Sequence, residues 1–146
     1  MSRTSWPLPL LLPLLPLVFG CSISSQLNQI EREADESVDI ICACDPPEVN
    51  GQTCEEAYGG DPFANLDRDC VEDALALDKE SSKESLDCQL DVMERYNDCL
   101  RDKLDCDMFD SISQCSAVFN DFGSCPPYAD DVQAAFQGCG TGEPDQ

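Results

Sequence analysis

The chain has 146 residues, 11 of them cysteine and none histidine, and its 30 acidic and 8 basic side chains give a formal net charge of −22. This charge opposes binding to nucleic acid, whose affinity comes mainly from cationic contacts with phosphate, and it opposes adsorption to an anionic lipid surface. Without histidine the chain has no Ser-His or Cys-His nucleophile pair, so we expect a non-enzymatic protein with no cofactor, metal or nucleic-acid partner.

Residues 1–20 have the order of a secretory signal peptide. Arg3 supplies a positive charge, an apolar run follows over 6–19, and the small residue Gly20 stands directly before Cys21. The run is shorter than the roughly 20 residues that a membrane-spanning helix needs, and several prolines interrupt it. We therefore expect a cleaved export signal rather than a transmembrane helix.

The end of this leader resembles the lipobox of bacterial lipoproteins. Leu17, Val18, Gly20 and Cys21 fit that pattern, whereas Phe19 stands where a small or hydroxyl residue is usual. The resemblance implies that Cys21 becomes the mature N-terminus and carries a diacylglyceryl thioether and an N-acyl chain of the palmitate type. The alternative is an ordinary secreted disulfide-rich protein, because Val18 and Gly20 also fit a conventional signal peptidase.

The same resemblance implies an address. In enteric-type bacteria an aspartate after the lipidated cysteine retains a lipoprotein in the inner membrane, and this chain has Ser22 at that position. We therefore expect an exported, lipid-anchored protein of the cell envelope, located in the outer membrane. Its membrane partner is bound through the anchor, and burial of two or more acyl chains, at about 0.8 kcal/mol per CH₂, makes such attachment stable. A protein or ligand partner is left open.

If Cys21 is lipidated, the remaining cysteines are even in number and can close five disulfides. An oxidising compartment outside the cytosol would keep such bridges closed. Spacing leaves their connectivity open, with Cys70–Cys88 and Cys125–Cys139 as two candidate pairs. The expected disulfide cysteines are Cys42, Cys44, Cys54, Cys70, Cys88, Cys99, Cys106, Cys115, Cys125 and Cys139.

The Cys42-x-Cys44 pair raises a redox or a metal interpretation, and the sequence favours neither. Thiol-disulfide oxidoreductases usually place two residues between their cysteines, next to a βαβ pattern. Zinc sites favour two to four intervening residues and often use histidine. Both cysteines are therefore predicted to form structural disulfides.

Four regions are expected along the chain. The signal peptide, 1–20, precedes the lipidated cysteine and a flexible tether over 21–37, where polar and charged side chains dominate. The alternative for the tether is a short surface helix that uses Leu27, Ile30 and Ala34. One cysteine-rich helical domain of ordinary size follows over 38–140, and 141–146 is predicted to be a disordered tail.

The domain is predicted to be all-α, a small disulfide-rich fold of about three to four helices after an irregular loop over 38–61. Turn dipeptides such as Asn50-Gly51 indicate that loop. A first helix is expected over 61–79, where apolar residues recur at three- and four-residue steps. Ser81 and Glu84 have the spacing of a capping box, which predicts a second helix to about residue 104.

Three cysteines are expected along one side of this second helix. The intervals between Cys88, Cys99 and Cys106 return their side chains to nearly the same azimuth at 3.6 residues per turn. A helix cannot bridge its own distant positions, so their partners are expected in other segments. Two shorter helices, over 111–119 and after Pro127, complete the predicted domain.

The acidic residues raise two further interpretations. Because the chain has 30 acids, some pair of carboxylates will lie at the separation that glycosidases use. Such a pair is therefore no evidence for glycoside hydrolysis. One segment approximates an EF-hand calcium loop, but Leu66 stands where the loop needs glycine and Phe63 replaces an oxygen ligand. Two classes stay open: a non-enzymatic binding or structural module of the envelope, and a low-affinity calcium-binding acidic protein. The oxygen-bearing residues of that segment are Asp61, Asn65, Asp67, Asp69 and Glu72.

Overall fold

The computed structural model describes residues 22–46, 51–60, 62–63, 65–108 and 111–140. Within these residues the regular secondary structure is helical, with isolated β-bridges such as Leu66–Gly140 and no strand. The all-α, disulfide-rich fold class is confirmed, with more helices than the three to four expected. They are α1 Ile23–Cys42, α2 Cys54–Tyr58, α3 Arg68–Ala76, α4 Lys79–Lys103, α5 Ile112–Cys115, the 3₁₀ helix η2 Ser116–Ser124, and α6 Asp130–Phe136.

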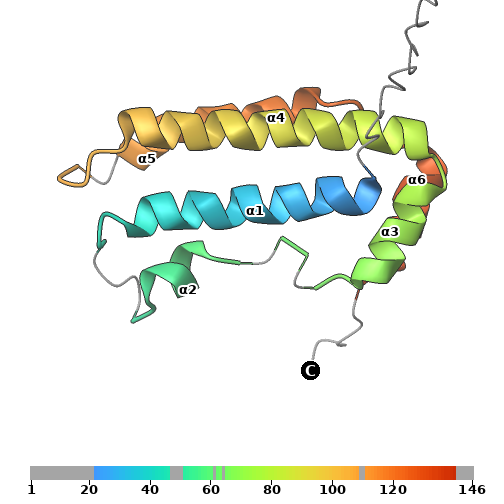
Figure 1. Ribbon diagram of the computed structural model, residues 1–146, viewed down its shortest axis with the longest axis horizontal. Coiled ribbons are helices and arrows are strands. Elements are labelled where there is room, and N and C mark those ends of the chain that lie inside the picture. The colour runs from blue at the N-terminus through green and yellow to red at the C-terminus, as the bar shows by residue number, and fades with distance from the viewer. Residues whose placement is uncertain (1–21, 47–50, 61, 64, 109–110, 141–146) are drawn as a thin grey trace, which may run out of the picture.

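Helices α1 and α4 form a parallel pair that is the centre of the fold (Figure 1). Gln26 near the start of α1 donates a hydrogen bond to Asp87 near the start of α4, and Ser37 further along α1 donates to Asn97 further along α4. Both helices therefore run in one direction. Between them in the sequence, α2 lies beneath the C-terminal half of α1 in this view and α3 lies beside the N-terminal end of α1.

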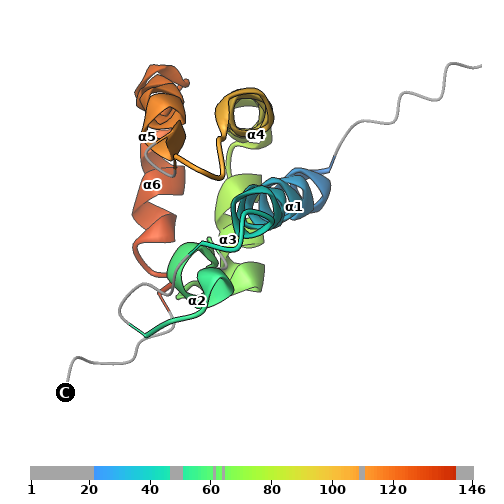
Figure 2. The ribbon, with the colours of Figure 1, turned by 90° about the vertical axis from the view of Figure 1, so that its left-hand side faces the viewer.

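After α4 the chain returns antiparallel to it through α5, η2 and α6. Figure 2 shows this returning segment to one side of the α1 and α4 pair. Three disulfides join α3 and α4 to the part of the chain that follows α4. They are nested, because in the sequence each pair encloses the one before it. From the inner pair outward they are Cys99–Cys115, Cys88–Cys125 and Cys70–Cys139.

The prediction of a flexible tether over 21–37 is wrong. This stretch lies almost entirely within α1, where Ile23, Leu27 and Ile30 are buried. At helical spacing these isolated apolar residues share one side of the helix, and that side packs on α3 and α4. The alternative of a helix through Leu27 and Ile30 is closer, but α1 belongs to the core rather than to the surface.

The irregular loop expected over 38–61 is also partly wrong, because α1 continues to Cys42 and α2 occupies Cys54–Tyr58. A capping box begins α2: the Thr53 hydroxyl accepts from the Glu56 amide, and the Glu56 carboxylate accepts from the Thr53 amide at 2.8 Å. Local hydrogen bonds of this kind allow a five-residue helix to form beside the Cys42–Cys54 disulfide.

Two expected helix starts are displaced. The carboxylate of Asp67 accepts from the amide of Cys70 at 2.9 Å and begins α3 there, whereas Asp61 lies outside the described residues. Asp78 accepts from the amide of Ser81 at 3.2 Å, so α4 begins before the predicted capping box at Ser81. In both cases the side chain of an aspartate supplies the cap.

The C-terminal half follows its prediction more loosely. The helix expected over 111–119 is a single turn, α5, that continues as the 3₁₀ helix η2 to Ser124, and the last helix begins at Asp130. No helix in the described part of the chain combines the length and apolar character needed to cross a membrane. The expected tail at 141–146 lies outside the described residues.

Candidate functional site

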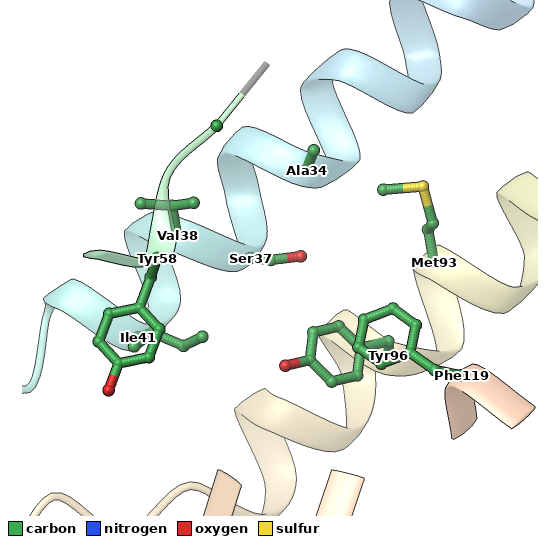
Figure 3. A pocket seen from close by; sticks show the side chains of 9 residues that line it. Ala34, Ser37, Val38, Ile41, Tyr58, Met93, Tyr96 and Phe119 are labelled. Atoms are coloured by element: carbon green, nitrogen blue, oxygen red, sulfur yellow. The ribbon is translucent and has the colours of Figure 1, made fainter. Parts of the chain in front are cut away.

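A cavity of about 300 Å³, cavity A, lies between α1, α4, η2 and the end of α2 with the residues that follow it. Figure 3 shows Ala34 and Ile41 along α1, with Met93 and Tyr96 across from them on α4. Most of the wall is therefore apolar. The lining residues are Ala34, Ser37, Val38, Ile41, Tyr58, Gly60, Met93, Tyr96 and Phe119.

Two aromatic side chains of cavity A are unusually exposed for their size. Tyr58 is 37% exposed and Phe119 is 43% exposed. The ring of Phe119 also packs on the buried ring of Tyr96, with centroids 4.2 Å apart, and burial raises the pKa of Tyr96. Cavity A thus has an aromatic rim that is partly in contact with water.

A second cavity of about 310 Å³, cavity B, lies nearer the start of α1 and α4 and is also bounded by α3, η2 and α6. Its few polar atoms have partners: Gln89 donates to the Tyr128 hydroxyl at 3.0 Å. Burial raises the pKa of Tyr128, so this hydroxyl stays protonated at neutral pH. The lining residues are Leu27, Ile30, Pro62, Phe63, Val71, Leu75, Leu86, Gln89, Met93, Phe122, Tyr128 and Phe136.

The chemistry of the two linings differs sharply from that of the chain as a whole. Charged side chains make up 26% of the sequence, yet none occurs among the described residues that line either cavity. Apolar cavities of this size suit apolar ligands, which polar or charged groups inside the site would disfavour. Among the described residues that line the two cavities, no nucleophile has a neighbouring base.

A buried polar contact lies beside cavity A. Asn97 on α4 is fully buried, and its amide nitrogen donates to the Glu33 carbonyl oxygen at 2.9 Å and to the Glu33 carboxylate at 2.8 Å. The Asn97 oxygen accepts from the Ser37 hydroxyl. These bonds fix the axial position of α1 on α4, and with it the two facing walls of cavity A.

Each of three arginines joins acids of two different elements. Arg68 on α3 pairs with Glu31 on α1 as well as with Glu72, and the Ser24 hydroxyl, which donates to Glu72, lowers the pKa of that carboxyl. Arg95 on α4 reaches Asp121 of η2 at 2.7 Å. In so acidic a chain, these cations reduce repulsion where neighbouring elements meet. The third arginine pairs as Arg101–Glu36 and Arg101–Asp98.

The structure pairs all ten cysteines of the described residues with one another. The candidate pairs Cys70–Cys88 and Cys125–Cys139 are wrong. The segment that returns after α4 lies antiparallel to α4 and brings Cys125 to Cys88 on α4 and Cys139 to Cys70 on α3. Cys21 lies outside the described residues. The five disulfides are Cys42–Cys54, Cys44–Cys106, Cys70–Cys139, Cys88–Cys125 and Cys99–Cys115.

The expected row of three cysteines along one side of α4 is correct for two of them. Cys88 and Cys99 both bond to the returning segment. Cys106 lies beyond the end of α4 and instead bonds to Cys44, after the end of α1. This bridge ties together the C-terminal ends of the two parallel helices.

The residues that approximate a calcium loop have other roles where the structure describes them. Asp67 caps α3 through the amide of Cys70, and Glu72 accepts from Ser24 and Arg68. Across the described residues, no cluster of three or more cysteine, aspartate or glutamate side chains is placed to hold a metal ion.

Sequence reasoning missed the two cavities. Ile41, Tyr58 and Phe119 come from three distant segments, and nothing in their local spacing indicates that they meet. The stripe of Leu27, Ile30 and Ala34 was the available signal. Extended to Ile41 at the same spacing, it would have marked one long buried face.

Comparisons with protein-family models, curated proteins and solved structures each gave no match to this chain.

Proposed function

We propose that this chain is an exported bacterial lipoprotein: a non-enzymatic binding module anchored to the outer membrane through acyl chains on Cys21. The pairing of the cysteines carries the proposal. All ten in the described residues bond to one another, so none of them is left to pair with Cys21. A cysteine at the end of a lipobox-like leader, with no internal partner to take it, fits lipidation.

The number of disulfides supports export. Glutathione and thioredoxin keep cytosolic thiols reduced, whereas the periplasm and the cell surface allow disulfides to persist. Five bridges in one small domain therefore favour an oxidising compartment. This holds for an ordinary secreted protein too, so the state of Cys21 decides between the two.

The cavities favour a binding module over a purely structural one. Protein interiors are normally packed as densely as organic crystals and contain few voids larger than a water molecule. Beside that dense interior, two apolar cavities of about 300 Å³ each are partly open at the surface. They are in the size range of sites for small ligands.

The test is the intact mass of the protein extracted from membranes. We expect a chain that begins at Cys21, carries the added mass of acyl chains, and lacks ten protons because of five closed bridges. The variant Cys21→Ser should lose the acyl mass and the membrane association while it keeps all five disulfides. An unacylated wild-type protein, or many thiols that react in the native state, overturns the proposal.

A further inference from the structure

We propose that cavities A and B are the two halves of one channel that takes a single acyl chain from a lipid without net negative charge. This inference rests on the binding part of the proposed function and is independent of the anchor at Cys21.

The two cavities lie in line along the same two helices. On α1, Leu27 and Ile30 line cavity B, and Ala34 and Ile41 line cavity A. These positions follow one another at three- and four-residue steps or multiples of them, so they share one side of the helix. Cavity A is therefore the continuation of cavity B along α1.

Helix α4 and the 3₁₀ helix repeat this relationship. Leu86 and Gln89 of α4 line cavity B, Tyr96 lines cavity A, and Met93 lines both. On η2, Phe122 faces cavity B and Phe119, one 3₁₀ turn away, faces cavity A. Three elements thus run past both cavities: α1 and α4 pass from cavity B to cavity A, and the antiparallel η2 passes from cavity A to cavity B.

The length of this line matches an acyl chain. Leu27 and Ile41 are separated by an axial rise of about 21 Å at 1.5 Å per residue. One leaflet of a bilayer has a hydrocarbon thickness of about 15 Å, half of the roughly 30 Å core. A single chain that lies along α1 therefore has room in the two cavities together but not in either alone.

Met93 is the only described side chain that lines both cavities. Methionine is unbranched, has three rotatable side-chain bonds and adapts to irregular space. It is half-buried here rather than fixed in the centre of the core. In the proposed channel, a change of the Met93 rotamer joins the two cavities.

Charge selects the class of lipid. The walls hold no charged residue among those described, so the interior recognises the chain and not a head group. The head group stays at the surface of a protein with formal charge −22. Repulsion disfavours an anionic head group such as a fatty-acid carboxylate, and a neutral one avoids that cost.

The experiment uses the full chain with Cys21→Ser, exported and oxidised, so that acylation plays no part. The neutral dye N-phenyl-1-naphthylamine is bound and then displaced by octanoyl, dodecanoyl and hexadecanoyl glycerol. We expect affinity to rise through the whole series, by up to about fourfold per added CH₂. Palmitate should displace the dye much less well than hexadecanoyl glycerol at low ionic strength.

Two variants locate the chain. Met93→Phe places a rigid ring at the junction, so the three glycerides should bind with similar affinities. Ala34→Phe fills cavity A and should reduce the affinity for hexadecanoyl glycerol at least tenfold. Ala134→Phe, at an exposed position on α6, adds the same ring away from both cavities and should leave binding unchanged.

A second measurement avoids any risk that these variants fail to fold. With ¹³C-labelled methionine methyl groups in the otherwise unaltered protein, hexadecanoyl glycerol should shift the signal of Met93. The signal of Met108, which is 63% exposed and lines neither cavity, should stay in place. A shift of Met108 instead, or no shift at all, rejects the site.

The outcomes separate the two proposals. If the dye binds but glyceride affinity stops rising after the octanoyl chain, a binding module survives and the joined channel is rejected. If neither dye nor glyceride binds, the binding part of the proposed function fails as well. Equal binding of palmitate and hexadecanoyl glycerol contradicts the charge selection.

Discussion

Asn97 of α4 donates hydrogen bonds to both the carbonyl oxygen and the carboxylate of Glu33 on α1, while its own oxygen accepts from Ser37. One fully buried amide therefore has all three of these contacts on the neighbouring parallel helix. A shift of α1 by one residue would break every one of them. This side chain is therefore one of the contacts that set the position of α1 and the alignment of the cavity walls.

Asn97→Asp should destabilise the protein by about 3 kcal/mol, because it replaces two donors with a buried negative charge beside the Glu33 carboxylate. The loss should shrink at acidic pH, where protonation removes the introduced charge. Urea denaturation at neutral and at acidic pH measures both effects. Asn120→Asp, at an exposed asparagine of η2, controls for the added charge and should cost little. A cost for Asn97→Asp that is equally small contradicts the role assigned to this amide.

Individual disulfides should differ in their contribution to stability. In the chain-entropy description, the Cys88–Cys125 bridge, with a sequence separation of 37, contributes about 4 kcal/mol, and Cys42–Cys54, with a separation of 12, about 3 kcal/mol. The paired variants C88A/C125A and C42A/C54A should follow this order in their free energies of unfolding. The reverse order would show that lost contacts in the folded state outweigh loop closure.

The low pKa of Glu72 gives a specific dependence of stability on pH. The Ser24 hydroxyl donates to this carboxylate, with help from Arg68, and lowers the pKa of Glu72 in the folded protein. Glu72 therefore contributes stability above its unfolded pKa, and that contribution is lost as pH falls through the lower folded pKa. The difference in melting temperature between wild type and Glu72→Gln should be largest at neutral pH and should close in acid.

Glu84→Gln, at an exposed site on α4, is the matched control for that measurement, because it also removes one negative charge from an acidic protein. It should leave stability unchanged or raise it slightly at neutral pH through reduced repulsion. If Glu72→Gln behaves in the same way, the Ser24 contact contributes nothing to folding.

Two adjacent glycines after α2 should respond differently to alanine. A Cβ atom at Gly59 would lie 2.1 Å from the Glu55 carbonyl oxygen, whereas one at Gly60 would meet nothing within 4 Å. Gly59→Ala should therefore cost about 2 kcal/mol through a displaced backbone, and Gly60→Ala should be nearly neutral. Thermal unfolding of the two variants makes the comparison, and equal melting temperatures would contradict the close contact.

The sequence predicts the helical class and the stripes of the longer helices because these depend on local spacing. It fails at α1, since the large apolar residues there are few and acids surround them. The helix forms because α3 and α4 cover its apolar side, which is a tertiary effect. The starts of α3 and α4 were misplaced for a different reason: several aspartates and serines compete as caps, and packing decides which one is used.

The candidate site was less predictable than the fold. Composition and the absence of histidine predict that the ten cysteines after Cys21 form disulfides with one another. The spacing of these cysteines cannot show which of them are partners. Cys88 and Cys125 meet only because the chain reverses after α4 and returns along it. The cavities depend on the same reversal, since Phe119 reaches Tyr96 from the returning segment.

The order of the five bridges also determines what a protease can release. Every peptide bond between Cys42 and Cys139 lies inside at least one closed loop, because the Cys44–Cys106 and Cys70–Cys139 loops overlap and Cys42–Cys54 extends them at the start. A single cut there leaves one covalent molecule. Separation of the N-terminal residues from the cross-linked body therefore requires cleavage ahead of Cys42, where from Ile23 onward the chain is a helix whose inner side is shielded by the core.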